Sequence, residues 1–287
     1  MSARRIGVLA WKDFDEAIRS RTLWASSAFL GALLGFVVLT TLIRPALSAR
    51  ELLSLFAVPV VWFVPIVSLV AGYVSVVGER KSGSLKLLLG VPVSRADVLL
   101  GKIVGRSGVI VVSVAVGFLV AAALSLVVMG SVPLVGLFGL FVATAVLGLV
   151  YASLAVSVSA LSTTRNRAMI AAIGLYALFN LVWSGVTRLV ASPVTGAFSP
   201  TGAPDWYLFA RLLSPSAAYA RLLHGVVGVD VPIPDLGMDG IPVMALLGAR
   251  ESVPVYLSGW AMLLVLAAWI CVAAAVSYLR FRDADLG

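Results

Sequence analysis

No charged side chain interrupts the stretch SGVIVVSVAVGFLVAAALSLVVMGSVPLVGLFGLFVATAVLGLVYASLAVSVSAL, which covers residues 107–161. An α-helix needs about 20 apolar residues to cross the hydrocarbon core of a bilayer. The stretch is long enough for two such helices, and the segment GSVP at 130–133 offers a break between them. We therefore predict two membrane-spanning helices, over roughly 107–129 and 134–161, joined by a short turn.

The rest of the chain repeats this pattern. Four more apolar runs cover roughly 23–43, 55–77, 168–190 and 255–278, and Arg188 is the only charged residue inside them. Of the 287 residues 61% are apolar and 12% are charged, about half the charged share of an ordinary soluble domain. This composition excludes a soluble globular enzyme and a disordered chain, and long apolar runs disfavour an outer-membrane barrel. We predict an all-α polytopic membrane protein with six transmembrane helices, forming a single transmembrane domain over 1–287.

The 21 Lys and Arg residues are unevenly divided between the two sides of this arrangement. Fifteen lie before the first span, between spans two and three, between spans four and five, or in the tail, and six lie on the other side. Basic residues concentrate on the cytoplasmic side of a membrane protein. The sequence therefore predicts a multi-pass protein of the cell membrane with both termini in the cytoplasm.

Two segments outside the spans are predicted to be helical. Residues 4–18 carry apolar residues at helical spacing, with Trp11 as an anchor, which favours an N-terminal interfacial helix on the cytoplasmic side. The alternative is an ordinary charged leader. Residues 191–254 form the only large extracytoplasmic loop, in which 205–213 and 216–227 are expected to be short helices.

The connection between spans two and three reads GERKSGSLKLLLGVPVSRADVLLGKIVG, residues 78–105. Its first apolar piece ends where Gly90 and Pro92 break it, and Ser94 is a suitable N-cap for a second helix that runs into span three. A plain connector needs only a few residues. The length of this loop favours a docking surface on the cytoplasmic side, and a basic loop held by anionic lipid is the alternative.

This loop resembles the signature of the ABC-2 family of ABC transporter permeases. The matching elements are Glu79–Leu85, Leu87–Leu89, Pro92–Arg95 and Leu99–Lys102. The resemblance extends to the six spans, the interfacial helix and the long fifth-to-sixth loop, and so covers essentially the whole chain.

The resemblance implies a cytoplasmic coupling helix between spans two and three that sits in a cleft of a separate ATPase subunit. The residues to which it assigns this coupling are Glu79, Leu85, Leu87, Leu88, Leu89, Pro92, Arg95, Asp97 and Lys102. It also implies a dimer with a second permease copy, identical or paralogous, surrounded by lipid, and export as the direction of transport. No nucleic-acid partner is expected.

The chain lacks the residues for nucleotide chemistry. Gly101-Lys102 has Ala96 where a phosphate-binding loop needs glycine, and Ile103 where it needs Ser or Thr. We predict no catalytic residue and no cofactor bound by this chain, with ATP and Mg²⁺ held by the partner ATPase. The single cysteine, Cys271, and single histidine, His224, exclude a zinc site built from several such ligands, and no metal site is predicted.

Four residues inside the spans are predicted to line the translocation path: Asn180, Tyr176, Pro59 and Pro65. Asn180 has an alternative role, because a polar residue in lipid often bonds a neighbouring helix. The two prolines are expected to kink or loosen span two.

Two alternatives stay open from the sequence. The run LLSPSAAYARLL, Leu212–Leu223, resembles a segment of permeases of the nitrous-oxide-reductase maturation type, which are copper-related, and the alternative is a gate or cap common to exporters of this shape. The competing function is that of an ATPase-independent membrane protein, a secondary carrier or a scaffold. The absence of an intramembrane carboxylate or histidine weakens a proton-driven carrier.

Overall fold

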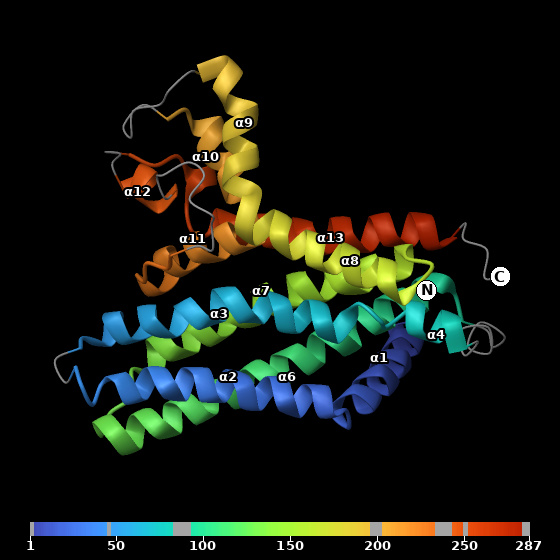
Figure 1. The fold of residues 1–287 in the computed structure, drawn as a ribbon, viewed down its shortest axis with the longest axis horizontal. Coiled ribbons are helices and arrows are strands. Elements are labelled where there is room, and N and C mark those ends of the chain that lie inside the picture. The colour runs from blue at the N-terminus through green and yellow to red at the C-terminus, as the bar shows by residue number, and fades with distance from the viewer. Residues whose placement is uncertain are drawn as a thin grey trace.

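The computed structural model describes residues 3–44, 47–82, 93–195, 203–232, 243–248 and 252–282, and these ranges contain helices and turns but no strand. Figure 1 shows a bundle of long helices with a smaller group of helices projecting from one side. The elements, in chain order, are α1 (Ala3–Ile18), α2 (Arg21–Thr40), α3 (Ala49–Gly72), α4 (Val77–Ser82), α6 (Arg95–Met129), α7 (Leu134–Leu161), α8 (Arg165–Ala177), the π-helix η1 (Leu178–Val182), α9 (Trp183–Thr195), α10 (Asp205–Leu212), α11 (Pro215–Val227), α12 (Val243–Gly248), the 3-10 helix η2 (Val255–Leu257) and α13 (Ala261–Arg282).

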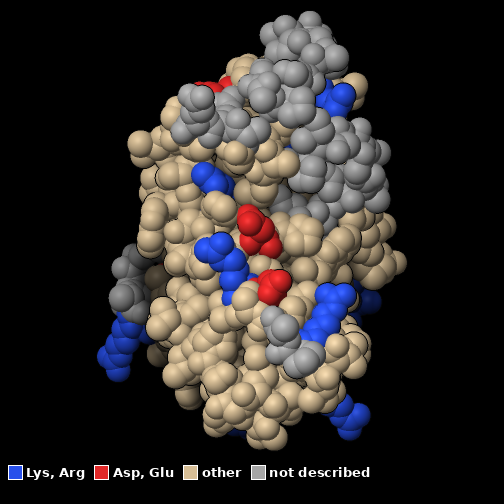
Figure 2. Space-filling view, turned by 90° about the vertical axis from the view of Figure 1, so that its left-hand side faces the viewer, with Lys and Arg blue, Asp and Glu red and all other residues tan. Residues whose placement is uncertain are grey.

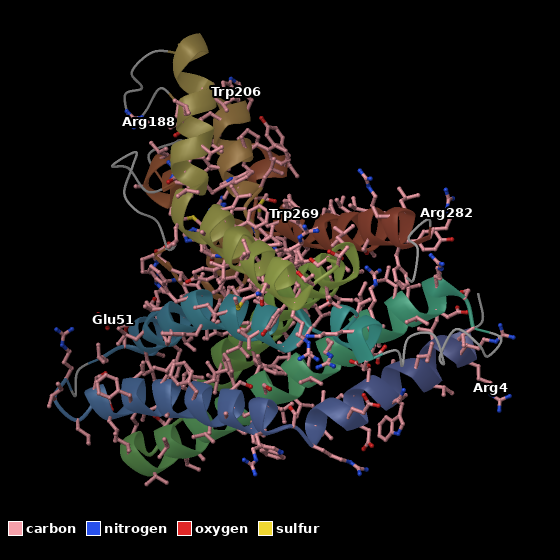
Figure 3. All side chains as sticks on the ribbon, turned by 45° about the vertical axis from the view of Figure 1, so that its right-hand side comes forward. Arg4, Glu51, Arg188, Trp206, Trp269 and Arg282 are labelled. Atoms are coloured by element: carbon pink, nitrogen blue, oxygen red, sulfur yellow. The ribbon has the colours of Figure 1, made fainter. Side chains whose placement is uncertain are left out.

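Six helical segments of the described chain are long and apolar enough to cross a membrane, which confirms the predicted number of spans. They are Leu23–Thr40, Ala49–Ser82, Arg95–Met129, Leu134–Leu161, Arg165–Ala191 and Ala261–Arg282. The chain enters and leaves the bundle at the same end, where α4 also lies (Figure 1). Figure 3 accordingly places Arg4 and Arg282 near one end and Glu51 near the other.

Figure 2 looks onto the end of the bundle opposite to the termini. Most of its described surface is uncharged, with a few acidic and basic side chains near the centre. This agrees with the uneven distribution of Lys and Arg in the sequence.

Helix α6 begins at the end of the 78–105 segment and continues as the third span, as predicted. Ser94 and Asp97 form a capping box at its first turn, and Gly130, with φ of 69°, ends it in the left-handed conformation. Its 35 residues correspond to about 52 Å at 1.5 Å per residue, well beyond the hydrocarbon thickness of about 30 Å. The first turns of α6 therefore extend out of the hydrophobic core of a bilayer.

The second span is interrupted, but not at its prolines. Helix α3 begins at the capping box of Ser48 and Glu51 and continues through Pro59 and Pro65 to Gly72. The chain turns over Tyr73–Val76 and then forms the short helix α4. The interruption of span two, which we expected at its prolines, therefore lies at the end of the span near α4.

The fifth span changes direction at η1. Figure 1 shows α9 leaving the line of α8 and projecting from the bundle together with α10 and α12. The predicted short helices of the outer loop are present as α10 and α11. Helix α11 lies in the bundle, packed against α7 and α13.

Candidate functional site

Helix α1 lies directly against the first turns of α6, and two glycines make this approach possible. A Cβ atom on Gly101 would lie 2.6 Å from the Cβ of Leu9, and one on Gly105 would lie 2.8 Å from the carbonyl oxygen of Ala10. Real Cβ atoms do not approach other heavy atoms so closely, so any larger residue would push α1 away. The helix predicted over 4–18 is therefore fixed to the base of span three.

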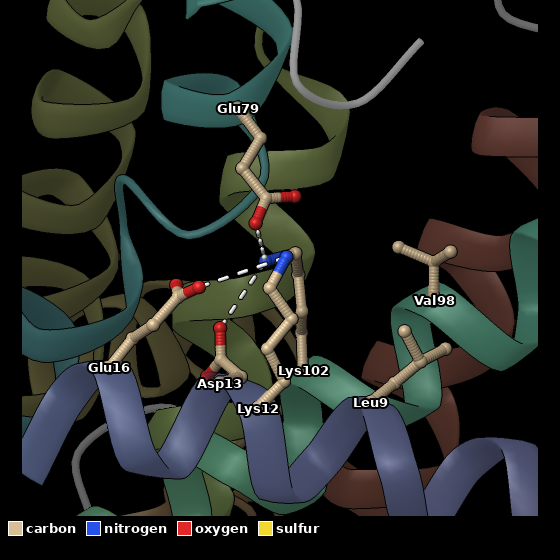
Figure 4. Close-up of a pocket in the computed structure, with 7 residues that line it drawn as sticks. All are labelled: Leu9, Lys12, Asp13, Glu16, Glu79, Val98 and Lys102. Atoms are coloured by element: carbon tan, nitrogen blue, oxygen red, sulfur yellow. Dashed lines mark hydrogen bonds and ion pairs between the residues drawn. The ribbon is translucent and has the colours of Figure 1, made fainter. Parts of the chain in front are cut away.

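The charged side chains of Asp13, Glu79 and Lys102 meet between α1, α4 and α6 (Figure 4), and Arg106 of α6 joins them. The ammonium of Lys102 lies 3.2 Å from Oδ1 of Asp13 and 2.8 Å from Oε1 of Glu79. Arg106 Nε lies 2.9 Å from Oδ2 of Asp13. We call Asp13, Glu79, Lys102 and Arg106 the ionic cluster.

The ionic cluster is largely shielded from solvent. The side chains of Asp13 and Lys102 are 4% and 7% exposed, and those of Glu79 and Arg106 are 20% exposed. Two carboxylates face two cations, so the charges balance. Removing one member of a buried ion pair leaves an uncompensated charge, which typically destabilises a protein by about 3–5 kcal/mol.

The turn between α3 and α4 is held by polar groups from other helices. Arg106 Nη1 donates to the carbonyl oxygen of Ala71 at 3.1 Å. The backbone N–H groups of Val76 and Val77 both donate to Oγ of Ser159 at 3.0 Å. These bonds satisfy backbone groups that the interruption removes from the helical pattern, so the turn is a defined structure.

The structure divides the predicted coupling residues into groups. Glu79 and Lys102 belong to the ionic cluster, and Asp97 caps α6 through Ser94. Arg95 donates from Nη1 to the carbonyl oxygens of Phe281 and Arg282 at the end of α13. The predicted residues that lie outside the described part of the chain are Leu85, Leu87, Leu88, Leu89 and Pro92.

A second buried group of polar side chains surrounds Asn180 in η1. Its side-chain amide donates to the hydroxyl of Tyr151 at 2.9 Å, and its carbonyl oxygen accepts from Oγ of Ser216 at 2.6 Å. The hydroxyls of Tyr151 and Ser216 lie 3.1 Å apart. We call these three residues the polar triad; it joins α7, η1 and α11.

The polar triad shows how deeply α11 is placed. Ser216 meets Tyr151, and three residues later the hydroxyl of Tyr219 lies 3.1 Å from Oγ1 of Thr144. Helix α11 therefore runs antiparallel to α7, from the middle of the bundle toward its outer end. The prediction that this segment belongs wholly to the outer loop is therefore wrong for its first turns. Tyr151 and Ser216 are not among the predicted site residues, because their only signal in the sequence is a polar side chain amid apolar residues.

The other residues predicted on the translocation path are more dispersed. Tyr176 is half-buried, and its hydroxyl lies 3.4 Å from the carbonyl oxygen of Trp62. Pro65 is buried within α3, whereas Pro59 is half-buried. The structure brings Asn180 and Tyr176 together, since the Asn180 amide also donates to the carbonyl oxygen of Tyr176 at 3.1 Å.

These features define the class: a helical, multi-pass membrane protein in which side chains of α1, α4 and α6 join the ends of the second and third spans. The family profile described as "ABC-2 family transporter protein" matches residues 8–286. The chain therefore belongs to the ABC-2 family and is a permease of the ABC transporter type.

Two curated relatives agree with this assignment, and both are named "Probable ABC transporter permease protein NosY". The protein from Stutzerimonas stutzeri is 31% identical over 290 residues, covering 96% of each chain. The protein from Pseudomonas aeruginosa (strain ATCC 15692 / PAO1) is 28% identical over 291 residues, covering 96% of this chain and 98% of the relative.

Proposed function

We propose that two copies of this permease form an exporter in the cell membrane, driven by separate ATPase subunits that bind its cytoplasmic loop. ATP binding brings the ATPase subunits together, and the loop carries their movement into spans two and three. Transport then follows from a shift between inward- and outward-facing states, because the ATPase binds the two states with different affinity.

The observation that supports this mechanism best is the way in which the loop is anchored. Helix α4 ends at Ser82, before the loop, and Ser94 caps α6 after it. The ion pair between Glu79 and Lys102 joins these two helices directly. A force on the loop would therefore act on the ends of both spans rather than on a slack connector.

Exposure of the fifth span supports the second copy. In spans five and six alike, 22% of the most apolar stretch is buried within one chain, compared with 44–50% in spans two, three and four. Met169, Ile170 and Ile173 of α8 are exposed. This face would line the contact between two copies.

The direction of transport, export, is proposed from the family alone.

Purification of the native complex tests the proposal. The tagged permease, extracted in mild detergent, should retain an ABC ATPase identified by mass spectrometry, with vanadate-sensitive ATP hydrolysis and the mass of two permeases and two ATPases. A permease that is recovered folded, without an ATPase and without ATP hydrolysis, would favour the ATPase-independent carrier or scaffold.

A further inference from the structure

The ionic cluster lies where α1 meets the two helices that flank the coupling loop. Helix α4 supplies Glu79, α1 supplies Asp13 and α6 supplies Lys102, as Figure 4 shows. Helix α6 also supplies Arg106. Asp13 contacts both cations, and Lys102 contacts both carboxylates. The ammonium group of Lys102 therefore joins both carboxylates of the cluster to α6.

We infer that Asp13 is a positioning residue of the transport cycle, which ties α1 to the anchored ends of the coupling loop so that these elements move as one body. The inference rests on the proposed function, because it assigns a moving part to the ATPase-driven cycle. In this arrangement α1 transmits the movement of the loop along the membrane surface and is more than an anchor.

The geometry around the cluster supports a rigid connection. Gly101 and Gly105 allow backbone-to-backbone approach of α6 to α1, and Arg106 extends the connection to the carbonyl oxygen of Ala71, at the end of α3. Helix α1 thus reaches span two through side chains of span three. A displacement of α4 would therefore displace α1 and α6 as well.

The outer face of α1 can pass this movement on. Val8 and Trp11 are 64% and 69% exposed, opposite the face that carries Ala10 and Asp13. An apolar, exposed face on an amphipathic helix is suited to the boundary between lipid headgroups and acyl chains. Movement of α1 would then be movement within that boundary.

A charge-balanced pair of substitutions separates positioning from simple structural support. Asp13→Asn alone leaves the cluster with one excess positive charge, and Lys102→Met alone leaves one excess negative charge, so each should lower the yield of folded permease. The double variant Asp13→Asn/Lys102→Met keeps one carboxylate and one guanidinium, and it should fold and bind the ATPase. It nevertheless removes the ion pairs that connect α1 to α4.

The matched control lies on the same helix. Lys12 and Glu16 form an exposed pair with 3.7 Å between their charged atoms, and their side chains are 51% and 55% exposed. The double variant Lys12→Met/Glu16→Gln removes the same two charge types from the exposed rim of the same pocket and leaves the ion pairs of the cluster in place.

The measurement is the distance between spin labels in the complex with its ATPase in lipid nanodiscs, by double electron–electron resonance. Labels are placed at the exposed positions Val8 in α1, Lys81 in α4 and Arg167 in α8, with Cys271→Ala as background. In the wild-type cluster, the Val8–Lys81 distance should be narrow and equal without nucleotide and with ATP-vanadate. The Val8–Arg167 distance should change between these states.

The double cluster variant should show a broadened Val8–Lys81 distance that changes with nucleotide, and the Lys12/Glu16 control should behave like the wild type. A wild-type Val8–Lys81 distance that changes with nucleotide, or a Val8–Arg167 distance that does not, would overturn the inference without any cluster variant. An unchanged distance in the double variant would overturn it as well. Failure of the wild-type permease to bind an ATPase would instead refute the proposed function.

Discussion

The guanidinium of Arg95 donates to the carbonyl oxygen of Phe281 at 2.6 Å, so the first turn of α6 holds the last turn of α13. A second bond, to the carbonyl oxygen of Arg282 at 2.9 Å, completes this contact. A cation at the C-terminal end of a helix satisfies carbonyl groups that have no partner within the helix. Arg95, at the start of α6, therefore also fixes the end of the sixth span.

Arg95→Glu should weaken retention of the ATPase partially and in a salt-dependent way. The new carboxylate repels the carbonyl groups at the end of α13 and reverses a charge beside the proposed docking surface. Pull-down of the ATPase at low and high salt measures the effect. Arg95→Gln, which loses the charge without reversing it, should retain more ATPase, and equal loss in both variants would contradict an effect of the reversed charge.

Leu88→Glu should abolish retention of the ATPase while the permease still inserts. If Leu88 fills an apolar part of the ATPase cleft, a carboxylate there would cost several kcal/mol of binding. The same pull-down measures the loss, with size-exclusion chromatography to check the permease. Lys12→Glu, on the exposed side of α1, is the control and should retain the ATPase; full retention by Leu88→Glu and Arg95→Glu together would exclude the loop as the docking surface.

The predicted orientation can be tested with single cysteines. Ser131, between α6 and α7, and Thr163, between α7 and α8, are both exposed at opposite ends of α7. In a Cys271→Ala background, a cysteine at Ser131 should react with an impermeant thiol reagent in intact cells, and one at Thr163 should react only after the membrane is opened. The reverse pattern would place the termini and the loop outside.

Asn180→Leu should lower the free energy of unfolding of the purified permease by about 0.6–2 kcal/mol, the range for polar contacts between membrane helices. Thermal unfolding in detergent measures the loss. The loss is limited because Tyr151 and Ser216 can still bond each other across 3.1 Å. Tyr176→Phe removes one long bond from a half-buried group and should cost less. A larger loss for Tyr176→Phe would show that the polar triad does not hold α11.

Gly101→Ala should destabilise the permease by about 1–3 kcal/mol, as overpacking in a closely packed contact does. Its methyl group would meet the Cβ of Leu9 at 2.6 Å and force α1 from α6. Gly7→Ala in α1, where a Cβ would meet nothing within 4 Å, should be neutral or stabilising because alanine favours helix. Thermal unfolding in detergent compares the two variants, and equal stability would contradict the close packing.

The spans followed from the sequence because lipid imposes a simple rule on them. Twenty apolar residues with satisfied backbone bonds form a helix whatever their neighbours are, so residues 134–161 were predicted with the bounds that the structure has. The start of α6 was predictable for a local reason as well, since Ser94 and Asp97 form a capping box within four residues.

The sites could not be predicted in the same way because they depend on contacts between distant segments. Asp13 is separated from Lys102 by 89 positions, and no spacing rule links residues so far apart. Glu79 and Lys102 were assigned to the loop by the family resemblance, while their enclosure together with Asp13 is visible only in three dimensions. Ser216 was likewise assigned to an outer loop, because a helix of 13 residues is too short to be recognised as membrane-embedded.

The position of α11 has a consequence for how the protein is made. In the orientation that the basic residues predict, this short segment would be translocated first and would dock into the bundle afterwards. Its contacts are with α7, η1, α10 and α13, and α13 is synthesised after α11. Docking of α11 therefore belongs to the final stage of biogenesis, when a nascent chain with all six spans in the bilayer still exposes the hydroxyl of Tyr151.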